Sequence, residues 1–304
     1  MEKFDLGLAY VWEYDVDFIN LAERTLQNSG ISTYQISNHN IFDVTQKIKN
    51  KELAFNFYLD RAADVDEDFE ELGKIISRRK TKIFNPYKKT EHAIDKANMH
   101  LEFISGGLHV PYSIIIPPHS ETEEIYISLD NLSVLGRPFI IKPCNTTGGG
   151  IGVVTGAETL REIIDERITN LDDKYILQQK IYPDYLEGKR GWFRCFWAFG
   201  KAIPAWWDDQ THIYRELNEN EIEKFNLKKL FTVTKKIAKI TELDFFSTEI
   251  VLTPDKNFVV VDYVNDQCDM RFKSFHVDGV PDSIVKEIID SMKRIIIREK
   301  KKLN

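Results

Sequence analysis

The sequence predicts an α/β protein in which a layer of βαβ units precedes two mixed α+β segments. Over residues 1–90, strand-like apolar runs alternate with amphipathic helical stretches, the order that parallel strands require. After residue 110, strand-like runs are joined by short turns such as Gly200-Lys201, which is typical of β-hairpins. A loop after residue 144 holds four of the 15 glycines within five positions. We therefore expect three parts, at residues 1–90, 91–180 and 181–304.

Hydrophobic spacing predicts the N-terminal elements one by one. Three strand-like runs are expected at residues 4–11, 31–36 and 53–59. Helical spacing falls between and after them, at residues 17–28, 40–49, 64–79 and 88–106, and Gly30 marks the end of the first helix. A short strand at residues 83–87 is broken by Pro86. A last amphipathic helix is expected at residues 282–299. We interpret it as a helix that docks on the rest of the protein, in preference to a membrane-binding or RNA-binding tail.

Composition limits the classes of function. The chain has 304 residues, with 41 basic and 48 acidic side chains and a net charge of −7, which argues against nucleic-acid binding. The sequence contains neither a secretory signal pattern nor an apolar stretch of membrane-spanning length, so we expect no membrane contact. The three cysteines form no CxxC pair, which favours reduced thiols and a cytoplasmic location. The oligomeric state stays open, a homodimer included.

The glycine-rich loop is the first chemical signal. It reads Asn145-Thr-Thr-Gly-Gly-Gly-Ile-Gly-Val-Val and follows the strand-like run Pro138-Phe-Ile-Ile-Lys-Pro. Glycines let backbone amides approach a ligand closely, and the hydroxyls of Thr146 and Thr147 can donate to anionic oxygens. The loop matches neither a P-loop nor a dinucleotide fingerprint. It is therefore interpreted as a flap over phosphates, with a functionless hairpin turn as the alternative.

Charged residues inside apolar strands give the second signal. Arg194 lies in a strongly aromatic strand and should meet an anion, either a ligand or an internal carboxylate. Glu249 and Asp262 flank the turn at residues 254–257 and can face each other across a hairpin. Opposed carboxylates repel unless a cation neutralises them, and with the amide oxygen of Asn265 they form an oxygen set suited to Mg²⁺. The alternative is that one acid pairs with a lysine or faces water.

The order of these motifs resembles the ATP-grasp superfamily. The motifs, in chain order, are Lys96, Ile140-Ile-Lys142-Pro, the Thr-Thr-Gly-Gly-Gly-Ile-Gly loop, Leu177-Gln-Gln-Lys-Ile, Arg194, Glu249 and Asp262…Asn265. The resemblance covers residues 90–270, and the N-terminal layer is similar to the domain that usually precedes it. It implies an α+β ATP-grasp fold, with a Rossmann-like βαβ domain followed by two α+β subdomains that clasp ATP between them.

The resemblance also implies roles for single residues. Lys96 and Lys142 would contact the ATP phosphates, and Arg194 would lie near the transferring phosphate, so that Lys142 and Arg194 are the expected catalytic residues. Mg²⁺, or Mn²⁺, would be held by Glu249, Asp262 and Asn265. The remaining ATP contacts would come from the phosphate-covering loop, a hinge strand that recognises adenine and two isoleucines on the adenine face: Thr146, Thr147, Gly148, Gly149, Gly150, Gln178, Gln179, Lys180, Ile181 and Ile250.

Two departures from the family pattern concern the metal strand. Many members have an acid, one residue and then Asn, whereas here two residues separate Asp262 from Asn265. Strand alternation would put these two side chains on opposite faces unless a bulge intervenes, so Asp266 and Asp269 are alternative ligands. D-alanine ligase-like members resemble each other in an Arg two positions before the first acid, where this chain has Ser247, so the chain is not assigned to that subclass.

The implied reaction is ligation. Superfamily members mostly phosphorylate a small-molecule carboxylate to an acylphosphate, which an amine or thiol attacks to form a C–N or C–S bond, with release of ADP and phosphate. A kinase of the same fold and an ATP-binding module without turnover are the alternatives. For the substrate carboxylate, Arg61, Arg215 and Arg271 are the guessed contacts, because Arg can bind two oxygens at once. A surface salt bridge is the competing explanation for each.

Overall fold

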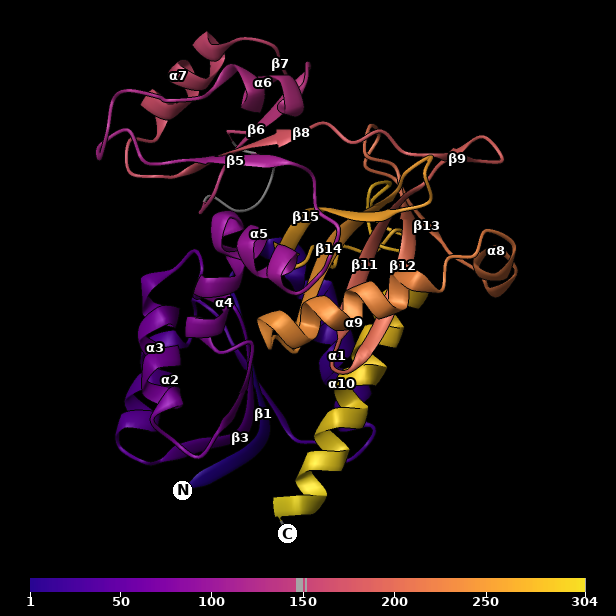
Figure 1. The fold of residues 1–304 in the computed structure, drawn as a ribbon. Coiled ribbons are helices and arrows are strands. Elements are labelled where there is room, and N and C mark those ends of the chain that lie inside the picture. The colour runs from indigo at the N-terminus through magenta and orange to yellow at the C-terminus, as the bar shows by residue number, and fades with distance from the viewer. Residues whose placement is uncertain (146–149, 151, 304) are drawn as a thin grey trace.

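The computed structural model describes residues 1–145, 150 and 152–303 (Figure 1). The N-terminal layer is a parallel sheet of order β2-β1-β3-β4, which confirms the predicted βαβ arrangement. Its strands are β1 (Glu2–Tyr10), β2 (Thr33–Ile36), β3 (Leu53–Arg61) and β4 (Lys82–Phe84). Its helices are the short 3₁₀ turn η1 (Glu13–Asp15), α1 (Val16–Gln27), α2 (Ile41–Lys49) and α3 (Glu67–Ser77).

The helix expected at residues 88–106 is two helices. These are α4 (Tyr87–Ile94) and α5 (Lys96–Ser105), separated by Asp95 in an extended conformation. The carboxylate of Asp95 accepts hydrogen bonds from the backbone N–H groups of Ala97 and Asn98, at 2.9 and 3.1 Å. Asp95 therefore caps a new helix. Lys96 is its first residue.

A central antiparallel sheet follows, with strand order β5-β8-β6-β7. Its strands are β5 (Ser113–Ile116), β6 (Phe139–Pro143), β7 (Val154–Ala157) and β8 (Tyr175–Gln179), and its helices are α6 (Leu129–Leu135) and α7 (Leu160–Thr169). Leu135, Ile141, Ile163 and Leu177 belong to one buried cluster that joins the helices to the sheet. The glycine-rich loop connects β6 to β7.

The C-terminal part is a five-stranded antiparallel sheet of order β13-β12-β11-β14-β15. Its strands are β11 (Trp192–Ala198), β12 (Lys201–Trp207), β13 (Tyr214–Glu216), β14 (Phe245–Leu252) and β15 (Phe258–Asn265). The hairpin β9 (Tyr185–Leu186) and β10 (Lys189–Arg190) precedes it, and the helices are α8 (Glu219–Lys224), α9 (Lys229–Thr241) and α10 (Asp282–Leu303).

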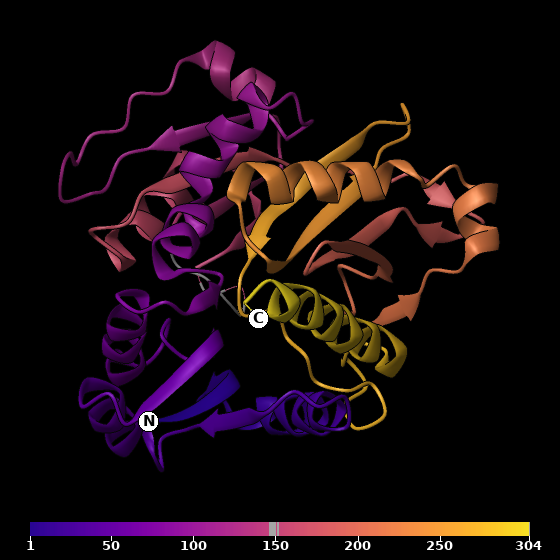
Figure 2. The same ribbon diagram turned by 90° about the horizontal axis from the view of Figure 1, so that it is seen from below.

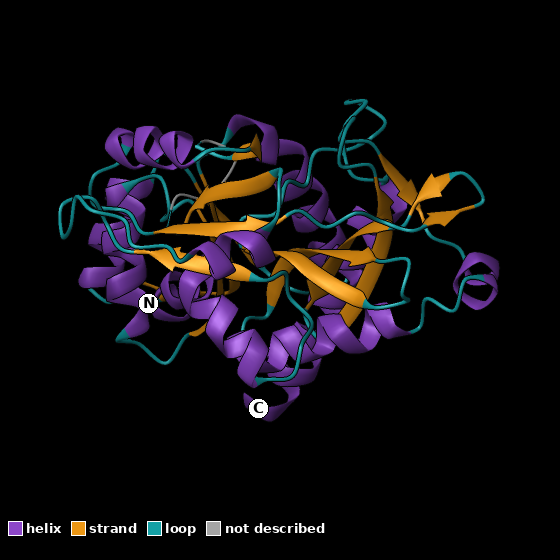
Figure 3. Ribbon diagram, turned by 45° about the horizontal axis from the view of Figure 1, so that its top comes forward, coloured by secondary structure: helices purple, strands orange, loops and turns teal. Residues whose placement is uncertain are grey.

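The five-stranded sheet is covered differently on its two faces. Phe193 and Ile250 pack with α9 on one face. On the other face, Phe196 and Ala198 share a buried cluster with α1, α10 and the N-terminal sheet. Figure 2 shows α10 between the N-terminal layer and this sheet, and Figure 3 shows the helices flanking the strands. This shared core fixes the N-terminal layer against the sheet that carries the predicted metal ligands.

Candidate active site

Three charged side chains form a row across three neighbouring strands. In the sheet register, Arg194 on β11 lies opposite Glu249 on β14, and Glu249 lies opposite Asp262 on β15. Directly opposed residues of antiparallel strands project from the same face, with Cβ atoms about 5 Å apart. The pairing of Glu249 with Asp262 across the hairpin is therefore observed as predicted.

A β-bulge brings Asn265 to the same face as Asp262. Asn265 lies opposite Ser247, and Asp262 lies opposite Glu249. Between these two pairs, β15 therefore contains one residue more than β14. The extra residue reverses the alternation of side chains. As a result, Asn265 Nδ2 donates to Asp262 Oδ2 at 2.8 Å, and the amide oxygen keeps its capacity as an acceptor. The unusual spacing in the sequence is thus compatible with the expected set.

The two alternative ligands lie in other interactions. The carboxylate of Asp266 accepts from Asn85 Nδ2, which also bonds the carbonyl of Phe245. Asp269 pairs with Arg271 at 2.7 Å. Of the three residues proposed to complete the set, Asn265 is the one that hydrogen-bonds to Asp262.

Arg194 meets an internal carboxylate, the outcome that the sequence had left open. Its guanidinium pairs with Glu249 Oε1, and Trp192 Nε1 donates to Glu249 Oε2 at 2.9 Å. Burial alone would lower the pKa of Arg194, but the neighbouring Tyr214, Glu249 and Asp262 raise the pKa above its ordinary value. Arg194 is therefore a fixed positive charge.

Two lysines approach Asp262 from other elements. Lys142 on β6 donates to the carbonyl of Val261 on β15 at 3.0 Å, so the central sheet reaches the C-terminal sheet at this point (Figure 1). The pKa of Lys96 is lowered by burial and by Lys142, against the opposing influence of Asp262. Burial would raise the pKa of Asp262, but Lys142, Lys96 and Arg194 together lower it. The three predicted cations therefore converge on one carboxylate.

The expected hinge strand lies beside this cluster. Gln178 is 2% exposed, and its Nε2 donates to the hydroxyl of Tyr263 at 3.1 Å. His100 Nδ1 lies 2.6 Å from the same hydroxyl, and burial lowers the pKa of His100, so the neutral ring can accept. Tyr263 thus joins β8, α5 and β15, the elements that carry Gln178, Lys96 and Asp262. Sequence reasoning missed Tyr263 and His100, because no local pattern marks a contact between residues so distant in the chain.

One of the two isoleucines expected on the adenine face lies elsewhere. Ile181 packs, together with Trp192, on the buried valines of β14 and β15, which are Val251, Val259 and Val261. Ile250 is fully buried among residues that face α9. Neighbours in a strand point to opposite faces, so Ile250 cannot share the face of Glu249. The structure therefore places Ile250 on the α9 face, whereas Val251 lies on the other face with Ile181.

Other predicted ATP contacts are only partly described. The backbone N–H of Gln179 donates to the carbonyl of Tyr112, just before β5, at 2.9 Å, and Lys180 Nζ lies 6.0 Å from the ring centre of Tyr182. Thr146, Thr147, Gly148 and Gly149 lie outside the described residues. Gly150 has a φ of +70°, a backbone conformation that favours glycine.

The three guessed substrate arginines all have carboxylate partners. Arg61 is 4% exposed and binds Asp15 through two bonds of 2.8 and 2.7 Å. Arg271 pairs with Asp269 and Asp278. The exposed Arg215 pairs with Glu221, and its register partner Trp206 pairs in turn with Phe193, which packs on α9. Arg215 therefore lies on the face opposite to Arg194, away from the row of charged side chains, and its contact with substrate stays a guess.

The donor set fits a magnesium ion by its chemistry. The described part of the chain holds no group of three or more His, Cys, Asp or Glu side chains placed to bind a metal ion, and the expected set has two carboxylates and one amide. Two carboxylates and an amide offer only oxygen atoms, which Mg²⁺ prefers, and such a site is normally completed by water and phosphate.

Among residues 1–145, 150 and 152–303, no helix has the length and apolarity needed to cross a membrane.

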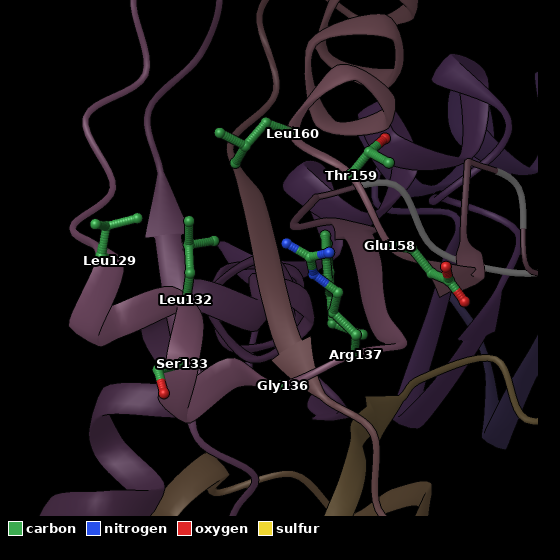
Figure 4. Close-up of a pocket in the computed structure, with 9 residues that line it drawn as sticks. Leu129, Leu132, Ser133, Gly136, Arg137, Glu158, Thr159 and Leu160 are labelled. Carbon is green, nitrogen blue, oxygen red and sulfur yellow. The ribbon is translucent and has the colours of Figure 1, made fainter.

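A pocket of about 350 Å³ lies away from this cluster. It is lined by residues of α6, the start of β6 and the start of α7, with Arg137 and Glu158 among them (Figure 4). None of the predicted ATP or metal residues lines it.

No family model and no curated protein matches the chain. Solved structures do match it. An ATP complex of D-alanine–D-alanine ligase from Bacillus anthracis has a TM-score of 0.66 at 15% identity, covering 98% of this chain and 99% of that chain. A RimK-domain ATP-grasp protein from Sphaerobacter thermophilus has a TM-score of 0.62 at 17% identity, with coverages of 94% and 98%. The D-cycloserine synthetase DcsG has a TM-score of 0.61 at 13% identity, with coverages of 96% and 99%. Since these similarities extend over nearly the whole chain, the protein has the ATP-grasp fold.

Proposed function

We propose that the protein is a magnesium- and ATP-dependent ligase that activates a small-molecule carboxylate and joins it to an amine. The observation that carries this proposal is the convergence of Lys96, Lys142 and Arg194 on Asp262, with Glu249 beside it. Phosphoryl transfer needs positioning and charge neutralisation more than a nucleophilic side chain. The cluster offers three cations for phosphate oxygens and two carboxylates with Asn265 for the metal.

In the proposed first step, a carboxylate oxygen of the substrate attacks the γ-phosphorus of ATP, and the bond to the ADP oxygen breaks. Lys96 and Lys142 would act as point charges on the phosphates, whereas the guanidinium of Arg194 can bind two oxygens of the transferred group. Glu249, Asp262 and Asn265 would hold Mg²⁺, which when bound neutralises charge on the phosphates. In the second step the acceptor nitrogen attacks the acyl carbon, phosphate leaves, and the nitrogen loses a proton.

The similar structures support an amine as acceptor. Two of them carry the names D-alanine–D-alanine ligase and D-cycloserine synthetase, and one was solved with ATP. A thiol acceptor remains the alternative for the second step. Arg61 and Arg271 are already neutralised by aspartates, so the substrate carboxylate would be held by other groups.

The test is ADP release from Mg-ATP by the purified protein, with carboxylates and amines supplied singly and in pairs. We expect release only with a matched pair, and about 10²-fold less in an Asp262→Asn variant, the scale seen when one charge-stabilising group is lost. An Arg215→Gln variant is the matched control, because it removes a paired charge from the opposite face. Release with a single hydroxyl compound would instead indicate a kinase, and ATP binding without any release would indicate a module without turnover.

A further inference from the structure

A second hollow, of about 290 Å³, opens at the opposite end of the N-terminal sheet. It lies where β1 and β3 begin and where α2 and α3 end, near the N-terminus in Figure 1. The candidate active site, by contrast, lies beyond the carboxyl end of β3. Leu53, Phe55 and Ile76 form an apolar floor, and each is at most 3% exposed.

The rim of this hollow carries only positive charge. Lys3, Lys51, Arg79 and Lys80 line it, and no acidic residue does. The amines of Lys3, Lys51 and Lys80 form no ion pair with any described residue. The nearby lysines on α2 and α3 do form ion pairs: Lys47 pairs with Asp43, Lys49 with Glu71 and Lys74 with Glu70. Four basic side chains therefore gather around one hollow, with no acidic residue in its lining, in a chain whose net charge is −7.

Lys51 occupies a backbone position that suits glycine better than lysine. It follows the end of α2 with a φ of +62°, and the N–H of Glu52 closes the helix end by donating to the carbonyl of Lys47 at 2.8 Å. Glycine is the usual residue at this position because it has no Cβ to strain the left-handed conformation. Helix C-termini favour nearby cations. That preference does not explain why a lysine, rather than glycine, occupies the left-handed position of residue 51.

The pocket in Figure 4 provides a contrast. Arg137 and Glu158 both line that pocket, so its lining carries one positive and one negative side chain. Of these two pockets in the described part of the chain, the N-terminal hollow is the one that combines one sign of charge with an apolar floor.

We propose that the N-terminal hollow binds a small organic anion, with its phosphate or carboxylate group on the lysine rim and an apolar ring or short chain over Phe55 and Ile76. Polar groups in the wall complete the lining, since Asn56 and Thr81 also border the space. This site is separate from the proposed ATP site and does not depend on the proposed ligase activity.

Titration calorimetry with phenyl phosphate and with benzoate tests the proposal. We expect saturable binding of at least one of them to the wild-type protein at millimolar concentration. Affinity should fall about tenfold in a Lys51→Gly variant and in a Lys80→Gln variant, because each loses one charge interaction. The melting temperature of Lys51→Gly should equal or exceed that of the wild type, so the loss of binding cannot come from unfolding.

The controls separate this site from others. A Lys142→Gln variant, which lacks a cation of the candidate active site, should bind the probes as the wild type does. Benzyl alcohol, a neutral relative of the probes, should bind much more weakly. The proposal is overturned if neither probe binds, if benzyl alcohol binds equally well, if both rim variants keep full affinity, or if affinity is lost only in Lys142→Gln.

Discussion

Arg61, which is buried, and Arg194, which is half-buried, both contact a carboxylate, but their surroundings differ. Arg61 binds both oxygens of Asp15 and the carbonyl of Cys268, and the side chains of the pair are each 2% exposed. Arg194 shares Glu249 with Trp192, and its side chain is 15% exposed. The first pair is closed and joins β3 to the segment after β15. The second is part of a row that continues to Asp262. Under the proposed function, we expect the closed Arg61–Asp15 pair to stabilise the fold and the open row of Arg194, Glu249 and Asp262 to bind a ligand.

The largest expected effect is on the closed pair. An Arg61→Met variant should lose about 3–5 kcal/mol in the free energy of unfolding, because Asp15 would be left buried and unpaired. Urea denaturation followed by circular dichroism measures this loss. Removing both charges in Arg61→Met/Asp15→Leu should restore much of the stability, and Arg215→Met, from an exposed pair, should change it by less than about 1 kcal/mol. A loss as small in Arg61→Met as in Arg215→Met would refute the structural role of Arg61.

The open row should respond mainly in activity. Arg194→Met should reduce turnover by about 10²–10³-fold, because the charge that we propose stabilises the transferring phosphate is lost. Its unfolding free energy should fall less than that of Arg61→Met, since Glu249 keeps its bond from Trp192. Steady-state ADP release and urea denaturation on the same preparation give both values. If Arg194→Met lost stability like Arg61→Met and kept its turnover, the two arginines would have been assigned the wrong way round.

A pH-dependent effect is expected beside the closed pair. Burial raises the pKa of Asp60 to about 6, while two backbone N–H groups partly oppose the rise. A carboxyl whose pKa is raised on folding costs stability as pH increases from its unfolded value to its folded value, here from 3.8 to about 6, and the cost is constant above that.

An Asp60→Asn variant keeps the oxygen that accepts from Ala62 and Ala63 but cannot ionise. Relative to wild type it should therefore gain about 3 kcal/mol well above pH 6 and little near pH 4. Denaturation midpoints of both proteins across this range provide the comparison. A difference that is flat with pH would show that Asp60 is not perturbed.

The smallest effect is expected for Tyr263, whose hydroxyl joins β8 to β15. Tyr263→Phe and Tyr175→Phe each remove one buried hydroxyl, and each should cost about 1–2 kcal/mol of stability. Only Tyr263 joins β8 to β15, so only its variant should bind Mg-ATP more weakly, by a few-fold as judged by calorimetry. Equal ATP affinity in the two variants would limit Tyr263 to a structural role.

The sequence predicted the fold because its evidence was local and repeated. Strand, helix and hairpin patterns each depend on neighbouring residues, and each motif could be read in the sequence together with its order. The ATP-grasp fold predicted from them is confirmed. The facing of Glu249 and Asp262 was also predictable, because a short turn fixes which strands pair.

The features that the sequence could not predict depend on strand register or on contacts between distant residues. Whether Asn265 lies on the same face as Asp262 depends on a β-bulge, and no pattern of residues predicts that bulge. Arg215 could be placed only once β13 was paired with β12. Ile250 was carried over from the family against the alternation of its own strand. The contact of His100 with Tyr263 spans 163 positions, beyond any local signal.

The most direct test of the central claim is calorimetric titration of ATP, with and without Mg²⁺, into wild-type protein and into Glu249→Gln and Asp262→Asn. We expect the wild type to bind ATP more tightly with Mg²⁺, and both variants to remain folded while losing the metal-dependent gain. Absence of ATP binding to the wild type, or a Mg²⁺ effect of full size in both variants, would contradict the assignment of this cluster as the site of Mg-ATP.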